Sequence, residues 1–213
     1  MRGVVVLGWA VVLAVLAGLA GCSSGGSSTT SGWQLTIYYT PVDRYHAGDP
    51  QPVVGCARPD CNGGAPGSED LGSYPGDFVD AVVFEGNGRI TAGPHTGEYL
   101  NWTDQAGFWL DAAPRDRDGK PLVPFVSADA DEDVLAGDTA FRVERCGRAA
   151  DGTEVAEDVC ERVRSAHWVV GGAFGADLGG AKHVDIYVGE ESSADFTESG
   201  WFTTLTEVEL AFP

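Results

Sequence analysis

Residues 171–189 read GGAFGADLGGAKHVDIYVG, and this stretch carries more structural information than any other part of the chain. Its glycines and alanines let backbone segments pack closely, or leave an open groove over which a polymer can lie. Two aspartates project from it, and the second, Asp185, opens an apolar run. A carboxyl group backed by apolar residues is a candidate for a raised pKa. Asp177 and Asp185 are therefore the first candidate site residues.

Outward from this stretch, the chain reads as short runs of β-branched and aromatic residues separated by Gly, Pro and Asp clusters, which is typical of strands. Many short strands at this spacing indicate a barrel or a sandwich. The strands that we predict are 33–40, 99–103, 107–110, 122–127, 139–145, 167–170, 184–188 and 203–212.

Two segments do not follow the strand pattern. Residues 78–85 are predicted to form a helix with Asp77 as its N-cap and Gly86 at its end, although their apolar positions also suit a strand. Residues 48–76 are rich in Gly and Pro, and we expect an irregular excursion there.

Composition excludes some classes of function. The 213 residues include 13 Lys and Arg against 32 Asp and Glu, a net charge of −19. Binding to nucleic acid requires a basic face that releases counterions, and an anionic membrane surface would repel this chain. Hydrophobic residues make up 43%, enough for a buried core. The length suits one domain of ordinary size.

The N-terminus predicts export. Arg2 precedes an apolar run from Val4 to Ala20, which ends in Leu-Ala-Gly before Cys22. This segment resembles a bacterial lipoprotein signal, in which residues 1–21 are removed and Cys22 carries lipid. An uncleaved anchor helix is the alternative. Residues 22–32 are polar and are predicted to be a flexible tether, so that 33–213 form the folded domain outside the cytoplasm, held at the membrane through lipid alone.

Four cysteines remain once Cys22 is set aside, an even number that suits an oxidising compartment. The short sequence separations favour one disulfide between Cys56 and Cys61 and another between Cys146 and Cys160. A zinc site is the competing interpretation, but the spacings contain no C-x2-C pair and no histidine is close in sequence. We therefore expect disulfides, with no metal and no cofactor.

Residues 171–189 resemble the end of the three-aspartate (3D) domain, a double-psi β-barrel found in membrane-bound lytic transglycosylase A and related wall proteins. DLGGA at 177–181 and DIYVG at 185–189 match the two halves of its pattern, with the aspartates eight residues apart where that pattern has eleven. HVD at 183–185 and DLG at 177–179 are similar to elements of family 45 endoglucanases and expansins. Residues 131–139 loosely match the segment of the 3D domain that carries its first aspartate. The resemblance implies a mainly β fold with a six-stranded double-psi barrel.

The same resemblance assigns roles to single residues. Asp185 matches the catalytic acid, while Asp177 and Asp131 match supporting aspartates for which a purely structural role is the favoured alternative. Asp43 stands where a family 45 enzyme has its base, although the expected cysteines around it are missing. Candidate substrate-binding residues are Tyr39, Trp102 and His183. The alternative for Trp102 is a place in the core, and the alternative for His183 is a position that merely flanks a strand.

The resulting functional hypothesis is a lipid-anchored protein that cleaves cell-wall glycan, peptidoglycan or a β-glucan, with Asp185 as general acid. A non-catalytic, expansin-like wall-binding module is the second hypothesis. A structural lipoprotein without activity is the third.

Overall fold

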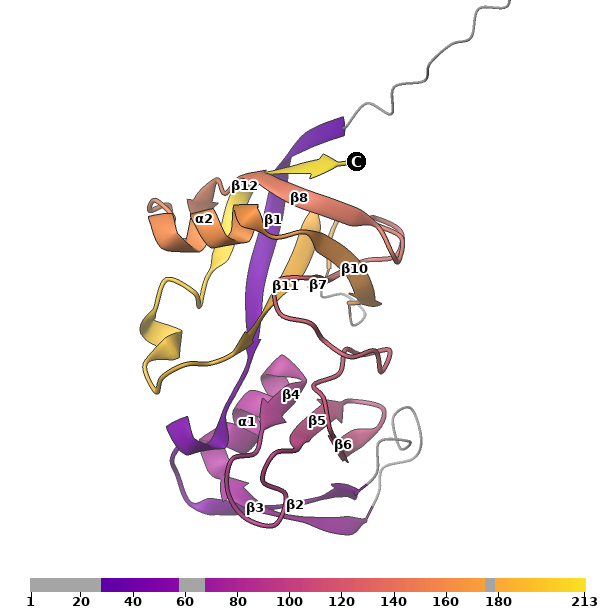
Figure 1. The fold of residues 1–213 in the computed structure, drawn as a ribbon, viewed down its shortest axis with the longest axis vertical. Coiled ribbons are helices and arrows are strands. Elements are labelled where there is room, and N and C mark those ends of the chain that lie inside the picture. Colours follow the sequence, from indigo (N-terminus) through magenta and orange to yellow (C-terminus); the bar gives the residue numbers. More distant parts are fainter. Residues whose placement is uncertain (1–27, 58–67, 175–178) are drawn as a thin grey trace, which may run out of the picture.

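Six strands close into a barrel in the computed structural model, which describes residues 28–57, 68–174 and 179–213 (Figure 1). Their order is β1-β11-β7-β10-β8-β12, and β12 pairs back onto β1 to close the barrel. The pairs β1–β11 and β7–β10 are parallel, and the other four are antiparallel. The expected six-stranded double-psi barrel is confirmed. The barrel strands are β1 (Ser28–Thr40), β7 (Ser127–Ala130), β8 (Ala140–Arg145), β10 (Trp168–Ala173), β11 (His183–Glu190) and β12 (Thr204–Phe212).

Alternation along the strands fills the barrel core. Val184 and Ile186 on β11 and Ala128 and Ala130 on β7 are buried in one hydrophobic cluster. Successive side chains of a strand point to opposite faces. The intervening aspartates of β7 and β11 therefore face outward from the barrel.

A second lobe is inserted between β1 and β7, below the barrel in Figure 1. Its sheet has the order β3-β2-β6-β5-β4, and its own hydrophobic core includes Phe78 and Val82 of helix α1. The lobe contains η1 (Asp43–Tyr45), β2 (Pro50–Cys56), β3 (Glu69–Pro75), α1 (Gly76–Glu85), β4 (Asn87–Arg89), β5 (Tyr99–Thr103) and β6 (Gly107–Asp111).

The expectation of an irregular excursion over 48–76 is wrong, because β2 and β3 lie there. Pro50 and Pro52 weakened the strand signal, since proline cannot donate to a β-ladder. Both prolines lie where β2 has β3 as its partner, whereas β6 pairs only with Gly55 and Cys56. Glycine is required at Gly55, because a Cβ atom there would lie 2.1 Å from the carbonyl oxygen of Phe108.

The predicted helix over 78–85 is confirmed as α1, which ends at Gly86 with a left-handed φ of 83°. The expected N-cap is wrong: Pro75 takes that position, and Asp77 lies inside the first turn. The Asp77 carboxylate instead accepts hydrogen bonds from the backbone N–H of Ala47 at 2.7 and 2.9 Å.

The other differences between the predicted and the observed elements lie at strand ends and in short elements. β1 begins at Ser28, so residues 28–31 of the expected tether pair with β12, with their side chains exposed. The strand expected over 122–127 is a turn in which the N–H groups of Val126 and Ser127 bond to the Val123 carbonyl. Besides β2 and β3, the elements that were not predicted are η1, β4, β9 (Arg148–Ala149), α2 (Glu157–Ser165) and η3 (Phe196–Glu198), and β7 shares only Ser127 with the strand expected over 122–127.

The Cys146–Cys160 disulfide is confirmed, with an S–S distance of 2.06 Å, and it joins the end of β8 to α2. Cys56 also forms a disulfide, while its predicted partner Cys61 and the lipidation candidate Cys22 lie outside the described residues. Within those residues, no helix is long and apolar enough to cross a membrane.

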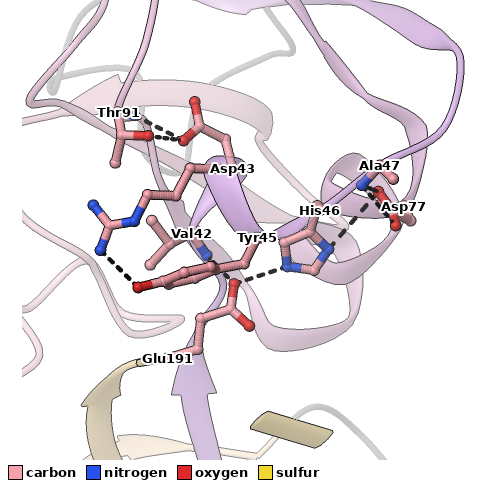
Figure 2. Close-up of polar contacts among 9 residues, drawn as sticks. Val42, Asp43, Tyr45, His46, Ala47, Asp77, Thr91 and Glu191 are labelled. Carbon is pink, nitrogen blue, oxygen red and sulfur yellow. Dashed lines mark hydrogen bonds and ion pairs between the residues drawn. The ribbon is translucent and has the colours of Figure 1, made fainter. Parts of the chain in front are cut away.

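Glu191, directly after β11, ties the barrel to the second lobe (Figure 2). Its Oε1 accepts a hydrogen bond from the backbone N–H of Val42 at 2.5 Å and lies 2.9 Å from Nε2 of His46. On the other side of the imidazole ring, Nδ1 of His46 lies 3.8 Å from Oδ1 of Asp77 on α1. This chain of contacts fixes α1 relative to strand β11.

Candidate active site

Four outward positions form a row across neighbouring barrel strands. Thr36 of β1 is opposite Asp185 of β11, Asp185 is opposite Asp129 of β7, and Asp129 is opposite Gly172 of β10. Directly opposed side chains on antiparallel strands have Cβ atoms about 5 Å apart. Two carboxyl groups therefore lie side by side on the outer face of the barrel.

This face forms one wall of a groove of about 1090 Å³ between the barrel and the second lobe. Asp185, Asp129 and Tyr38 line the barrel side. The opposite wall is formed by the C-terminal half of α1, including Phe84 and Glu85. A groove of this size can hold several rings of an extended polymer.

Asp185 is fixed by its neighbours on β11 and β1. Its Oδ1 lies 3.0 Å from Nε2 of His183, and the same ring nitrogen is 2.9 Å from Oγ1 of Thr36. The Asp185 side chain is 26% exposed, so its carboxyl group can reach a molecule in the groove. His183 therefore lies beside this carboxyl group on the same strand.

Asp129 is more deeply buried than Asp185. The pKa of Asp129 is raised to about 7, chiefly by burial; the interaction with the Tyr38 hydroxyl lowers it, and the negative charges of Asp116 and Asp185 add to the rise. Burial and the nearby Asp129 also raise the pKa of the Tyr38 hydroxyl. Asp129 can therefore hold a proton near neutral pH.

Gly172 makes room for the Asp129 carboxyl group. A Cβ atom at Gly172 would lie 2.4 Å from Oδ1 of Asp129, whereas one at Gly171 would have its nearest neighbour at 3.6 Å, Oδ2 of Asp116. We expect Gly172→Ala to displace Asp129 and to lower the rate of any reaction in the groove by about tenfold, since small misplacements of reacting groups are costly.

Steady-state kinetics of both alanine variants would test this prediction, with Gly171→Ala as the matched control. Equal rates for Gly172→Ala and wild type would show that the position of Asp129 is unimportant.

Glu85 is the ionisable group on the opposite wall that lies deepest. Burial raises its pKa to about 8, a hydrogen bond from the Tyr39 backbone N–H opposes this rise, and the charges of Asp185 and Glu191 add to it. The carboxyl group is therefore held in its protonated form at neutral pH.

Aromatic side chains face the groove from both lobes. Phe84 of α1 is 82% exposed and Phe202 is 44% exposed, and Trp102 and Phe174 complete the set. Exposed aromatic faces are suited to stacking on the apolar faces of sugar rings. The groove thus combines carboxyl groups with apolar surfaces.

The structure brings Asp185, His183 and Trp102 together along the groove, as lining residues. Asp131 is not among those lining residues: its Oδ2 accepts a hydrogen bond from Gly180 N–H at 2.8 Å, and Gly179 packs on the same carboxylate. This contact anchors the loop before β11, which agrees with the structural alternative for Asp131. Asp177 lies outside the described residues.

Two further candidates lie elsewhere. Asp43 is buried in the second lobe, where its Oδ1 accepts hydrogen bonds from Thr91, and it does not line the groove (Figure 2). Tyr39 is also buried, and its ring packs on Phe196 and Phe202. The geometry therefore does not support a base role for Asp43 or direct substrate contact by Tyr39.

Sequence reasoning missed Asp129, Glu85 and Tyr38. Asp129 has a recognisable signal, because it alternates with the small residues Ala128 and Ala130 as an outward position of a strand does. Glu85 has no such signal, since only the inserted lobe brings α1 against the barrel. No group of His, Cys, Asp or Glu suited to hold a metal ion is found among the described parts of the chain.

Comparison with solved structures identifies the fold. The chain is similar to Escherichia coli MltA with bound chitohexaose at 16% identity and a TM-score of 0.53, covering 84% of this chain and 70% of that one. A second structure of E. coli MltA, described as a unique lytic transglycosylase fold, matches at 15% identity and a TM-score of 0.50, covering 84% and 71%. No protein-family model and no curated protein matches the sequence. At this identity the likeness establishes the fold.

Proposed function

We propose that this protein cleaves the glycan strands of peptidoglycan in the groove, with Asp185 as the general acid. The observation that carries this proposal is the pair of adjacent carboxyl groups, Asp185 and Asp129, on the wall of a long groove between two lobes. The likeness to a lytic transglycosylase fold, including a structure with bound chitohexaose, supports a glycan as the occupant.

The proposed reaction uses this pair of carboxyl groups. Asp185 donates its proton to the glycosidic oxygen, and the bond between that oxygen and the anomeric carbon breaks. A hydroxyl oxygen of the same sugar bonds to the anomeric carbon, and its proton returns to the Asp185 carboxylate. Asp129 can hold a proton beside Asp185 near neutral pH. Cys22 would hold the domain on the outer face of the membrane through its lipid.

Product chemistry tests the proposal. The full chain, purified in detergent micelles, is incubated with purified peptidoglycan, and soluble products are identified by mass spectrometry. Anhydro-sugar ends support the proposed reaction. New reducing ends indicate hydrolysis, sedimentation with the wall without soluble products indicates a binding module, and the absence of both indicates a structural lipoprotein; each of these results contradicts the proposal.

The rate of cleavage should fall above about pH 7, because Asp129, whose pKa is raised to about 7, ionises there and no longer holds a proton beside Asp185. Asparagine at this position stays neutral, so we expect Asp129→Asn to lose the fall in rate near pH 7. Asp151→Asn, at an exposed carboxyl group of the same groove, serves as the control and should leave the profile unchanged. A fall near pH 7 that persists in Asp129→Asn would show that Asp129 is not the group responsible.

A further inference from the structure

Glu85 occupies a position where a negative charge is unfavourable for three independent reasons. Its side chain is only partly exposed in the groove wall. It is the last residue of α1, and the partial negative charge at a helix C-terminus repels an anion. The charged side chains that face it, Asp185 and Glu191, are both acidic.

The polar contacts around Glu85 do not compensate for the cost of a negative charge at this position. Its carboxyl oxygen Oε2 accepts one long hydrogen bond, from the backbone N–H of Tyr39 at 3.4 Å. The groove contains two arginines, but Arg115 pairs with Asp111 at 2.8 Å and Arg117 pairs with Asp104 at 2.9 Å. Other ionisable groups lining the groove are Tyr38, Asp80, Asp116, Asp129, Asp151 and His183.

The distance between Glu85 and the proposed acid can be judged along β1. Thr36 is opposite Asp185, and the N–H that binds Glu85 belongs to Tyr39, three residues further on. Three residues of a strand span roughly 10 Å. Glu85 therefore lies further along the groove than Asp185, within reach of the same bound chain.

We propose that Glu85 binds the glycan in its protonated form, donating a hydrogen bond from its carboxyl O–H to an uncharged sugar oxygen, a hydroxyl or an acetamido carbonyl. This proposal rests on the proposed function, because it assumes a glycan in the groove. An ionised carboxylate cannot donate this hydrogen bond. The sugar that meets Glu85 must also be uncharged, since an acidic group there would meet the negative charges of Asp185 and Glu191.

Binding of chitohexaose, measured by calorimetry between pH 6 and pH 9.5 with the full chain in detergent micelles, tests this role. Wild type should bind about tenfold more weakly at pH 9 than at pH 6, because only the protonated fraction is competent. Glu85→Gln keeps a neutral donor, so it should bind within about threefold of wild type at pH 6 and lack the weakening near pH 8. Glu85→Ala should bind weakly at every pH. Asp80→Asn, on the same helix and in the same groove, is the matched control and should behave as wild type.

The outcomes separate this inference from the function on which it rests. If wild type binds chitohexaose and Glu85→Gln weakens near pH 8 as wild type does, the role of Glu85 is overturned and the proposed function is untouched. If Glu85→Ala binds as tightly as wild type at pH 6, the role is likewise overturned. If wild type binds neither chitohexaose nor peptidoglycan at any pH, both proposals fail.

Discussion

Replacing Asp185 by Asn should lower the rate of peptidoglycan cleavage by about 10²- to 10⁴-fold, the range over which positioned general acids act. Asparagine has nearly the same shape as aspartate but cannot deliver a proton to a leaving oxygen. Asp185 is partly exposed in the groove and is held by His183, so the substitution should leave the fold intact. Release of soluble fragments from purified peptidoglycan, followed by mass spectrometry, measures the effect.

Two controls accompany the measurement on Asp185→Asn. Asp80→Asn changes another carboxyl group of the groove and should retain full activity. Thermal unfolding of Asp185→Asn should match that of wild type within about 0.5 kcal/mol, as expected for a change away from the core. Cleavage by Asp185→Asn at the wild-type rate would remove Asp185 from the mechanism.

Glu191→Ala should lower the free energy of unfolding by about 3 kcal/mol, the largest loss of stability that we predict. The Glu191 side chain is buried, and its removal leaves the Val42 N–H and the His46 ring without their acceptor (Figure 2). Breaking a buried pair by removing one partner is costly for this reason. Urea unfolding followed by tryptophan fluorescence measures the change.

The neighbouring residue offers a matched control. Glu190 also joins the two lobes, accepting a hydrogen bond from Tyr99 and lying 3.7 Å from Arg89, but its side chain is 41% exposed. Exposed ion pairs contribute little, so Glu190→Ala should cost less than about 1 kcal/mol. Equal losses for the two variants would show that burial of Glu191 does not determine its contribution.

The Glu191 contact should also depend on pH. The hydrogen bond to Glu191 raises the pKa of His46, burial opposes this rise, and the charges of Glu191, Asp77 and Asp43 add to it. A histidine whose pKa is raised in the folded state stabilises that state below its unfolded pKa of about 6.5 and loses the effect as pH rises through the folded value. Wild type should therefore exceed Glu191→Gln in stability by more at pH 5.5 than at pH 9. A pH-independent difference would exclude a charged His46.

Much of the barrel could be predicted from local patterns. A strand was predicted over residues 184–188, where Val184 and Ile186 alternate with Asp185, and Asp129 alternates with two alanines in the same way, although the strand around Asp129 was not predicted. The helix ending at Gly86 was also predictable, because glycine readily adopts the left-handed conformation found there. The β2–β3 pair was not predictable from the sequence. Its prolines and exposed side chains do not form a strand pattern, and β2 pairs chiefly along one edge.

The sequence by itself predicted most barrel strands and favoured the disulfide between Cys146 and Cys160, because these depend on residue pattern and spacing along one segment; Asp185 as the candidate acid came from the resemblance to the 3D domain. Only the tertiary structure decided which outward residues meet. Asp185 and Asp129 are opposed because β11 and β7, far apart in the chain, are neighbours in the barrel. Glu85 faces them because an inserted lobe carries α1 against that face. Contacts between distant segments follow from strand order and lobe packing, which no local pattern of residues specifies.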